Sequence, residues 1–169
     1  EELTYRVLRN FGFVPTDDQR NAIEVFARFM TDRNERSVML LRGSAGTGKT
    51  SLAAAIVRTM QELKQRVSLL APTGRAAKVF SLNAGQPAAT IHRAIYREKA
   101  FTGLDGKFNL NVNLFRDRLF MVDEASMISL SAGNTTFGSG CLLDDLIQYV
   151  YNGRNCRLLL VGDKAQLPP

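Results

Sequence analysis

The feature that most constrains this chain is the segment GSAGTGKT at positions 43–50. It follows a short apolar run, Val38 to Leu41, and precedes an alanine-rich helical stretch from Thr50 to about Gln65. In the order strand, glycine-rich loop and helix, the pattern G-x-x-x-x-G-K-[ST] forms a phosphate-binding loop. The glycines let the backbone wrap closely, so that successive N–H groups and the N-terminus of the helix can face phosphate oxygens. The segment therefore predicts a nucleotide-binding α/β fold.

Short apolar runs of strand length alternate with helical patterns along the rest of the chain. Thr16 and Gln19 have the spacing of a capping box, which predicts a helix from Asp17 to about Asp32. The alternation predicts an α/β domain whose parallel sheet carries helices on both faces and binds ligands at the carboxyl ends of its strands. Besides Val38 to Leu41, the predicted strands are Val67 to Ala71, Leu119 to Val122 and Leu158 to Val161.

Side chains suited to phosphate chemistry follow two of these strands. Lys49 supplies a positive charge, and Thr50 supplies a hydroxyl that can bind Mg²⁺ at the phosphates. The strand that ends in Asp123 and Glu124 has the form of a Walker B element. Asp123 would then hold the Mg²⁺ shell, and Glu124 would orient or deprotonate the attacking water. A helix cap is the alternative for this acidic pair. The sequence predicts ATP and Mg²⁺ as ligands, with Lys49 and Glu124 as catalytic residues.

Positive charge is concentrated in the middle of the chain. The net charge is +6, and residues 41–100 carry 10 basic residues against Glu62 and Glu98, a local balance of +8. The two flanking segments each sum to −1. We expect a polyanion near the motifs of the middle segment, and a solvated basic surface is the alternative.

The composition, with 45% hydrophobic and 22% charged residues, is that of an ordinary globular domain, and 169 residues suffice for one core. No apolar run approaches the roughly 20 residues of a membrane span, and the first residues lack the features of a signal peptide. Cys141 and Cys156 form no CxxC pair and are expected to be core thiols. We predict a cytoplasmic protein without membrane contact. Because the chain runs from Glu1 to Pro169 and stops directly after a dense motif, we expect a fragment of a longer protein.

The ordered motifs resemble superfamily 1 helicases, and within them the RecD-like branch that includes the alpha subunit of exodeoxyribonuclease V. Only the phosphate-binding loop is generic, whereas the ordered set is specific and spans nearly the whole chain. The resemblance implies one RecA-like P-loop NTPase domain over residues 1–169, with a lead-in at 1–16 and an inserted hairpin at 97–118. The motifs are PTDDQ at 15–19, GSAGTGKT at 43–50, APTGRAA at 71–77, TIHRAIY at 90–96, VDEASM at 122–127 and VGDKAQLPP at 161–169.

By this resemblance Gln19 reads the adenine base, since a side-chain amide can donate and accept at the base edge together. The capping box is its alternative role, because one amide cannot fill both roles well. Gln166 matches the catalytic glutamine that senses the γ-phosphate and couples it to bound DNA, with Asp163 supporting that loop. A turn is the alternative there. The residues expected to bind ATP are Gln19, Gly43, Ser44, Ala45, Gly46, Thr47, Gly48, Lys49, Thr50 and Ser51.

Two further motifs match segments that contact single-stranded DNA in this family. Thr73, Gly74 and Arg75 would present a hydroxyl, a backbone N–H and a guanidinium to a sugar-phosphate chain. The local positive charge agrees with this role, because phosphate contacts supply most non-specific affinity. His92 is the only histidine, and a structural role is its alternative. The expected nucleic-acid contacts are Pro72, Thr73, Gly74, Arg75, Lys78, Thr90 and His92.

The resemblance implies a DNA helicase motor of repair and recombination, in which ATP hydrolysis moves two RecA-like domains along single-stranded DNA. Travel from 5′ to 3′ is typical of the branch, and nuclease or other repair subunits are expected partners. The family's arginine-bearing motifs belong to a second RecA-like domain beyond residue 169. We therefore expect this chain alone to bind ATP and Mg²⁺ but to hydrolyse ATP slowly.

An insertion between sheet strands is predicted around residues 101–114. Asp105-Gly106 supplies a turn, and apolar residues alternate with asparagines from Phe108 to Leu114, which predicts a hairpin with a one-sided strand. The hairpin lies where related enzymes insert a strand-separating pin. A decorative edge hairpin is the alternative.

Other functions share parts of this pattern. An RNA helicase of the same superfamily would carry the same motifs. A P-loop GTPase or small-molecule kinase shares the phosphate site, but the sequence has no guanine-reading N-K-x-D motif and leaves GDKAQLPP unexplained. A nucleotide-gated single-strand-binding module without catalysis is a further alternative, against which the intact phosphate and Mg²⁺ residues argue.

Overall fold

A five-stranded parallel sheet forms the centre of the computed structural model, which describes residues 2–32, 37–43, 48–98, 108–130 and 141–163. The strand order is β1-β7-β6-β2-β3, and each neighbouring pair is parallel. The predicted α/β fold with a parallel sheet is confirmed. The strands are β1 (Val38–Gly43), β2 (Arg66–Ala71), β3 (Ala88–Thr90), β6 (Arg118–Val122) and β7 (Arg157–Asp163).

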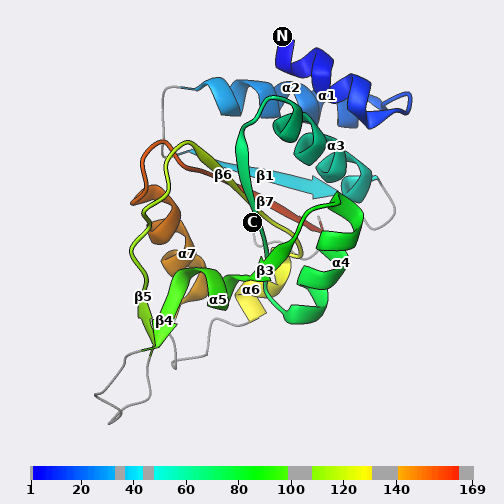
Figure 1. Cartoon of the computed structure of the whole chain (residues 1–169). Coiled ribbons are helices and arrows are strands. Elements are labelled where there is room, and N and C mark those ends of the chain that lie inside the picture. Colours follow the sequence, from blue (N-terminus) through cyan, green and yellow to red (C-terminus); the bar gives the residue numbers. More distant parts are fainter. Residues whose placement is uncertain (1, 33–36, 44–47, 99–107, 131–140, 164–169) are drawn as a thin grey trace.

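Helices cover both faces of this sheet (Figure 1). In β6, Leu119 and Met121 face a core shared with α1 to α4, whereas Phe120 and Val122 face a second core shared with α5 to α7. A strand buried on both faces has no polar side, which explains its continuous apolar sequence. None of the described helices has the length and apolarity needed to cross a membrane. The helices are α1 (Glu2–Phe11), α2 (Asp17–Thr31), α3 (Lys49–Glu62), α4 (Gly74–Ala84), α5 (Ile91–Ile95), α6 (Ser126–Leu130) and α7 (Leu142–Tyr151).

Helix α2 is held at both ends. At its N-terminus the predicted capping box forms, because Gln19 N–H donates to Thr16 Oγ1 at 3.1 Å and Thr16 N–H donates to Gln19 Oε1 at 2.9 Å. At its C-terminus Arg157 of β7, which is 8% exposed, donates to the carbonyls of Phe29 and Asp32 at 3.0 and 2.6 Å. These carbonyls have no partner within the helix, so the guanidinium satisfies them and ties α2 to the sheet.

A second sheet joins β4 (Tyr96–Glu98) to β5 (Phe108–Leu110), antiparallel and with Tyr96 opposite Leu110. It is the antiparallel pair that the hairpin pattern predicts, and the turn at Asp105-Gly106 lies outside the described residues. The pair is fixed to α7, because the Tyr96 hydroxyl donates to the buried carboxylate of Asp145 at 2.5 Å.

The predicted one-sided strand over residues 108–114 is wrong after Leu110. Val112 and Leu114 are 64% and 88% exposed, and the buried side chain is that of Asn113. Its Nδ2 donates to the carbonyls of Tyr149 and Val150 at 3.0 and 3.2 Å, at the end of α7. The two carbonyls satisfy the buried amide, so Asn113 can be buried here while Val112 and Leu114 stay exposed, and the one-sided apolar pattern ends at Leu110.

Candidate nucleotide and nucleic-acid site

The predicted motifs gather at the carboxyl edge of the sheet. Gly43 closes β1 in register with Asp163 at the end of β7, and Asp123 directly follows β6. Thr73 follows β2, the next strand in the sheet. The parallel topology therefore brings residues that are distant in sequence to one edge, where ligands of such sheets bind.

Part of the predicted nucleotide site lies outside the described residues. Of the flanking positions, Asp163 pairs through its backbone with Gly43, and Ser51 is exposed on the first turn of α3. The predicted site residues outside the described ranges are Ser44, Ala45, Gly46, Thr47 and Gln166.

Gly48 precedes α3 in a conformation that favours glycine, with φ +84°. A Cβ built on Gly48 would lie 2.6 Å from Gln19 Nε2. The amide of Gln19 thus accepts from Thr16 through its oxygen and directs its nitrogen toward the phosphate-binding loop. The capping role of Gln19 is confirmed, and its nitrogen lies beside the loop, where a nucleotide base could be reached.

Lys49, Thr50 and Asp123 meet at this edge. Thr50 and Asp123 line one small cavity between α3 and α4. Burial raises the pKa of Asp123, while the N–H of Glu124, which donates to Asp123 Oδ1 at 2.9 Å, and the nearby charge of Lys49 lower it. Burial makes the negative charge of Asp123 costly, and a bound cation would offset that cost. The Asp123 carboxylate and the Thr50 hydroxyl are both oxygen ligands of the kind that hard cations such as Mg²⁺ prefer.

The turn after β6 is fixed by the strands on both sides. Asp123 N–H donates to the carbonyl of Leu70 in β2 at 3.0 Å, and Ala125 N–H donates to Val161 in β7 at 2.9 Å. Between them Glu124 adopts φ +54°, which is uncommon for a residue with a side chain. The Glu124 side chain is exposed at the same edge. Backbone strain of this kind persists only where surrounding contacts impose it, and it clusters at functional sites.

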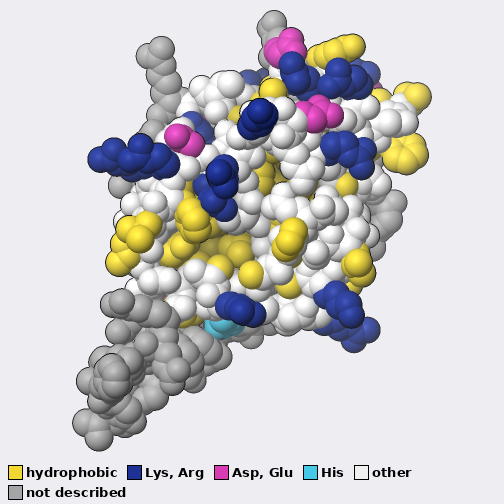
Figure 2. Space-filling view, in the orientation of Figure 1, with side chains coloured by type: hydrophobic (Ala, Val, Ile, Leu, Met, Phe, Trp, Pro, Cys, Tyr) yellow, Lys and Arg dark blue, Asp and Glu magenta, His cyan; other side chains and the backbone are white. Residues whose placement is uncertain are grey.

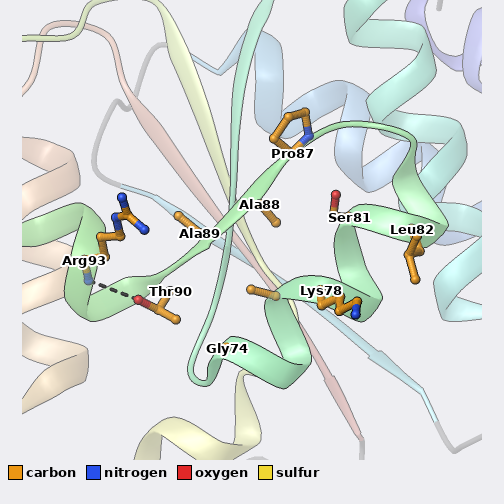
Figure 3. A pocket seen from close by; sticks show the side chains of 10 residues that line it. Gly74, Lys78, Ser81, Leu82, Pro87, Ala88, Ala89, Thr90 and Arg93 are labelled. Atoms are coloured by element: carbon orange, nitrogen blue, oxygen red, sulfur yellow. Dashed lines mark hydrogen bonds between the residues drawn. The ribbon is translucent and has the colours of Figure 1, made fainter.

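A groove of about 640 Å³ lies between α4 on one side and β3 with α5 on the other (Figure 3). Gly74, Lys78 and Thr90, all predicted nucleic-acid contacts, line it. Lys78 and Arg93 approach the groove from opposite elements, α4 and α5. The rim is thus cationic, while the floor is mainly Ala77, Ala88 and Ala89.

The other predicted nucleic-acid residues differ in accessibility. Thr73 Oγ1 accepts from Ala76 N–H at 3.1 Å, so Thr73 caps α4, and its hydroxyl hydrogen can still be donated. Arg75 is exposed, whereas Pro72 is buried. His92 is half-buried with its ring 5.7 Å from that of Tyr96, and burial lowers the pKa of His92. Burial therefore favours the neutral imidazole of His92, which could serve as a hydrogen-bonding group.

The sequence profile of a family described as an AAA domain matches residues 29–169. This chain belongs to that AAA-domain family. Among curated relatives, the ATP-dependent RecD2 DNA helicase of Deinococcus radiodurans is 30% identical over 156 residues, which cover 92% of this chain and 19% of the relative. The ATP-dependent DNA helicase dda of Enterobacteria phage T4 is 32% identical over 78 residues, 46% of this chain and 17% of the relative. The predicted resemblance to RecD-like superfamily 1 helicases is confirmed.

These relatives are longer than the AAA domain. The chain spans between 13% and 19% of the length of the curated relatives it matches. Among solved structures, the Pif1 helicase from Candida albicans is similar with a TM-score of 0.49 and 22% identity, covering 93% of this chain and 34% of that one.

One residue of the groove, Arg93, was not predicted from the sequence. Arg93 lines the groove from α5, whereas Lys78 lines it from α4. Only the position of Arg93 three residues after Thr90, whose hydroxyl accepts from Arg93 N–H at 3.2 Å, could have indicated it. Among the described residues no three His, Cys, Asp or Glu side chains gather as a metal site. Thr50 and Asp123 fit Mg²⁺ nevertheless, because this ion keeps several waters and needs only one or two protein ligands.

Proposed function

We propose that this domain is the ATP-hydrolysing motor of a DNA helicase. The observation that carries the proposal is the convergence of Lys49, Thr50 and Asp123 at the end of a phosphate-binding loop. A lysine, a hydroxyl and a carboxylate in this arrangement suit a nucleoside triphosphate with Mg²⁺. Two relatives, the RecD2 helicase of Deinococcus radiodurans and the dda helicase of Enterobacteria phage T4, are ATP-dependent DNA helicases, which agrees with this chemistry.

In the proposed mechanism each residue has one task. Lys49 would bind the β- and γ-phosphates, and Thr50 and Asp123 would hold Mg²⁺. When bound there, the ion would supply positive charge against the charge that develops on the phosphoryl oxygens. Glu124 orients the attacking water and accepts its proton at a carboxylate oxygen. Glu124 directly follows Asp123 in the chain and has φ +54°, an uncommon backbone conformation that supports a functional role for this turn. Gln166 is proposed to contact the γ-phosphate and to couple its presence to DNA binding, and Asp163 is proposed to support the loop that carries Gln166.

Single-stranded DNA is the proposed track, with contacts from Thr73, Gly74 and Arg75 and from the rim of the groove. Thr73 and Gly74 start α4, whose N-terminal N–H groups favour an anion. Lys78 and Arg93 add charge on the two sides of the groove. Pro72 would shape this turn, and His92 would add a neutral hydrogen bond. RNA is the alternative polymer.

The whole protein is proposed to travel 5′ to 3′ in DNA repair, in the cytoplasm. A second RecA-like domain would supply the arginine that completes the ATP site, an effect typically worth roughly 10³ to 10⁵ in rate. The β4–β5 pair is proposed to separate the DNA strands. Replacing residues 97–109 by Asn-Gly would join the opposed Tyr96 and Leu110 by a two-residue turn. This change should abolish unwinding and spare DNA-stimulated ATP hydrolysis. Parallel loss of both activities, or of neither, would exclude the role.

The motor proposal is tested by ATP hydrolysis of the full-length protein with and without single-stranded DNA or RNA. DNA should stimulate turnover. Lys49→Ala should lower ATP affinity, whereas Glu124→Gln should lower kcat by roughly 10² to 10⁴ with ATP affinity retained. Arg28→Ala, on the exposed side of α2, is the control and should match the wild type. Stimulation by neither polymer would favour a small-molecule kinase, and nucleotide-dependent DNA binding without turnover would favour a binding module.

A further inference from the structure

We propose that the opposite edge of the sheet carries a second nucleic-acid surface, which binds the phosphate backbone of a single strand. Five basic residues form it, and we name them the amino-edge row. They lie at or just before the starts of three adjacent strands, β7, β6 and β2, at the end of the sheet opposite the proposed nucleotide site. The row consists of Lys64, Arg66, Arg116, Arg118 and Arg154.

Three left-handed turns build the row. Lys64, Asp117 and Asn155 have φ of +59°, +53° and +52°, and each lies one or two residues before the start of β2, β6 or β7, respectively. Hydrogen bonds join the turns to one another. Asn155 Nδ2 donates to Asp117 Oδ1 at 2.8 Å, Asp117 N–H donates to the Arg154 carbonyl at 2.8 Å, and Gln65 Nε2 donates to the Asp117 carbonyl. The framework therefore holds four exposed basic side chains, whereas the fifth, Arg118, is half-buried and donates to Ser68 Oγ at 2.8 Å.

The row brings like charges together. Arg66 lies opposite Arg118 in the β2–β6 register, and Arg116 bridges to Arg154. Like charges directly opposite one another are destabilising. Within the described ranges no carboxylate forms an ion pair with any member of the row. Asp117, the acidic residue of these turns, accepts from Asn155 instead. A bound polyanion would relieve this repulsion.

The chemistry of the row suits phosphate better than a point anion. Four of its five members are arginines, whose planar forks match phosphate oxygens. Neighbouring strands lie about 4.8 Å apart, so the row extends for roughly 10 Å across three strands. Figure 2 shows Lys and Arg side chains along the upper left of the molecule, where Figure 1 places the starts of β2, β6 and β7.

Residues 111–115 connect the row to the β4–β5 pair. Along this segment Val112, Leu114 and Phe115 are 64%, 88% and 41% exposed, and Arg116 follows. The Arg118 guanidinium lies 3.9 Å from the centre of the Phe115 ring. Exposed apolar and aromatic groups beside cations are the combination that binds single strands, because bases stack while phosphates pair with charge. This favours a single strand over a duplex and over an acidic peptide.

The surface is tested by equilibrium binding of the full-length protein to a fluorescent single-stranded 20-mer at several salt concentrations without nucleotide. The row variant is Arg66→Gln/Arg116→Gln/Arg154→Gln. Its control, Arg20→Gln/Arg28→Gln/Arg58→Gln, removes the same charge from exposed positions of α2 and α3. Loss of three phosphate contacts should lower the salt slope by roughly 2 and the affinity by about tenfold or more. The control should stay within about twofold of the wild type.

Equal affinities of the row variant and its control would overturn the proposal. So would a row variant that loses affinity only for a duplex or only for a polyglutamate peptide. If circular dichroism shows that the triple variant does not fold, the same criterion applies to a pair of double variants. The row variant is then Arg66→Gln/Arg154→Gln, and its control is Arg28→Gln/Arg58→Gln. The test is independent of the motor proposal. Arg75→Gln/Lys78→Gln should remove the stimulation of ATP hydrolysis by DNA but leave the row's contribution to DNA affinity. If DNA does not stimulate ATP hydrolysis by the wild-type protein, the motor proposal fails and the proposal for the row is unaffected.

Discussion

The side chain of Gln19 and the backbone of Gly48 are in direct apposition, with Gln19 Nε2 2.6 Å from where a Gly48 Cβ would lie. This contact joins the start of α2 to the end of the proposed phosphate-binding loop. It requires glycine at position 48 for two reasons, the positive φ and the missing space. Helix α2, held at its other end by Arg157, would thus form a fixed wall of the proposed nucleotide site.

Gly48→Ala should therefore damage both the fold and the site. The left-handed conformation costs about 1–2 kcal/mol with a side chain, and the new methyl group would displace Gln19. We expect a loss of roughly tenfold or more in ATP affinity, measured by titration calorimetry. Gly85→Ala is the matched control, since Gly85 has φ +73° but no atom within 4 Å of its Cβ position. It should lose similar stability in thermal unfolding and keep its ATP affinity. Equal ATP affinities in the two variants would contradict the Gln19 contact.

Gln19→Glu separates the two roles of this residue. A carboxylate still accepts from Thr16 N–H, so the capping box and the thermal stability should persist. The donor that faces Gly48 is lost, and with it the ability to donate to adenine. ATP should bind more weakly and its preference over GTP should fall. Thr16→Ala is the complementary variant and should cost about 1 kcal/mol of stability at unchanged nucleotide preference. An unaltered ATP to GTP ratio in Gln19→Glu would leave Gln19 with the cap alone.

Lys78→Gln and Arg93→Gln should weaken single-stranded DNA binding to a similar extent. They lie on opposite sides of one groove, so a phosphate chain in it would meet both. Each variant should reduce the slope of log affinity against log salt by about 0.7. Arg58→Gln, an exposed cation of α3, is the control. A salt slope that changes for Lys78→Gln alone would restrict the contact to α4.

Tyr96→Phe should destabilise the attachment of the β4–β5 pair to α7. Removal of the hydroxyl deprives the buried Asp145 carboxylate of a donor, at a cost of about 1–3 kcal/mol in chemical unfolding. Tyr5→Phe, at a tyrosine that is 63% exposed, should cost nothing measurable. If both variants unfold at the same denaturant concentration, the Tyr96 contact adds no stability.

The hydrogen bond between Tyr96 and Asp145 should also make the stability of the fold decrease at high pH. Burial and the Asp145 bond raise the pKa of Tyr96 above its usual value of 10. The unfolded state therefore loses this proton first, and stability falls as pH rises above about 10. Tyr96→Phe should show a smaller fall than the wild type when unfolding is compared at pH 9 and pH 11. An equally steep fall would mean that other groups account for it.

Local sequence patterns predicted the helices and strands that form the carboxyl edge of the sheet. The capping box of α2 forms, and four predicted strands appear with ends within two residues of their predicted positions. These succeed because a capping side chain and a fully buried strand depend on nearby residues. The alternation through Asn113 failed, since it could not reveal that the end of α7 offers two carbonyl acceptors.

The amino-edge row lay beyond the reach of sequence reasoning for a different reason. Arg116 and Arg154 belong to a flank whose net charge is −1, whereas Arg66 belongs to the basic middle segment. Only the parallel registers of β7, β6 and β2 bring them together. Charge counted along a chain does not show which turns share an edge of a sheet.

We propose that Lys49, Thr50 and Asp123 form one site for ATP and Mg²⁺. This site can be tested by calorimetric ATP titration with and without Mg²⁺, in the wild type and in Asp123→Asn. Mg²⁺ should raise the ATP affinity of the wild type, and Asp123→Asn should lose this gain while staying folded. A variant that keeps the full Mg²⁺ effect would contradict the site.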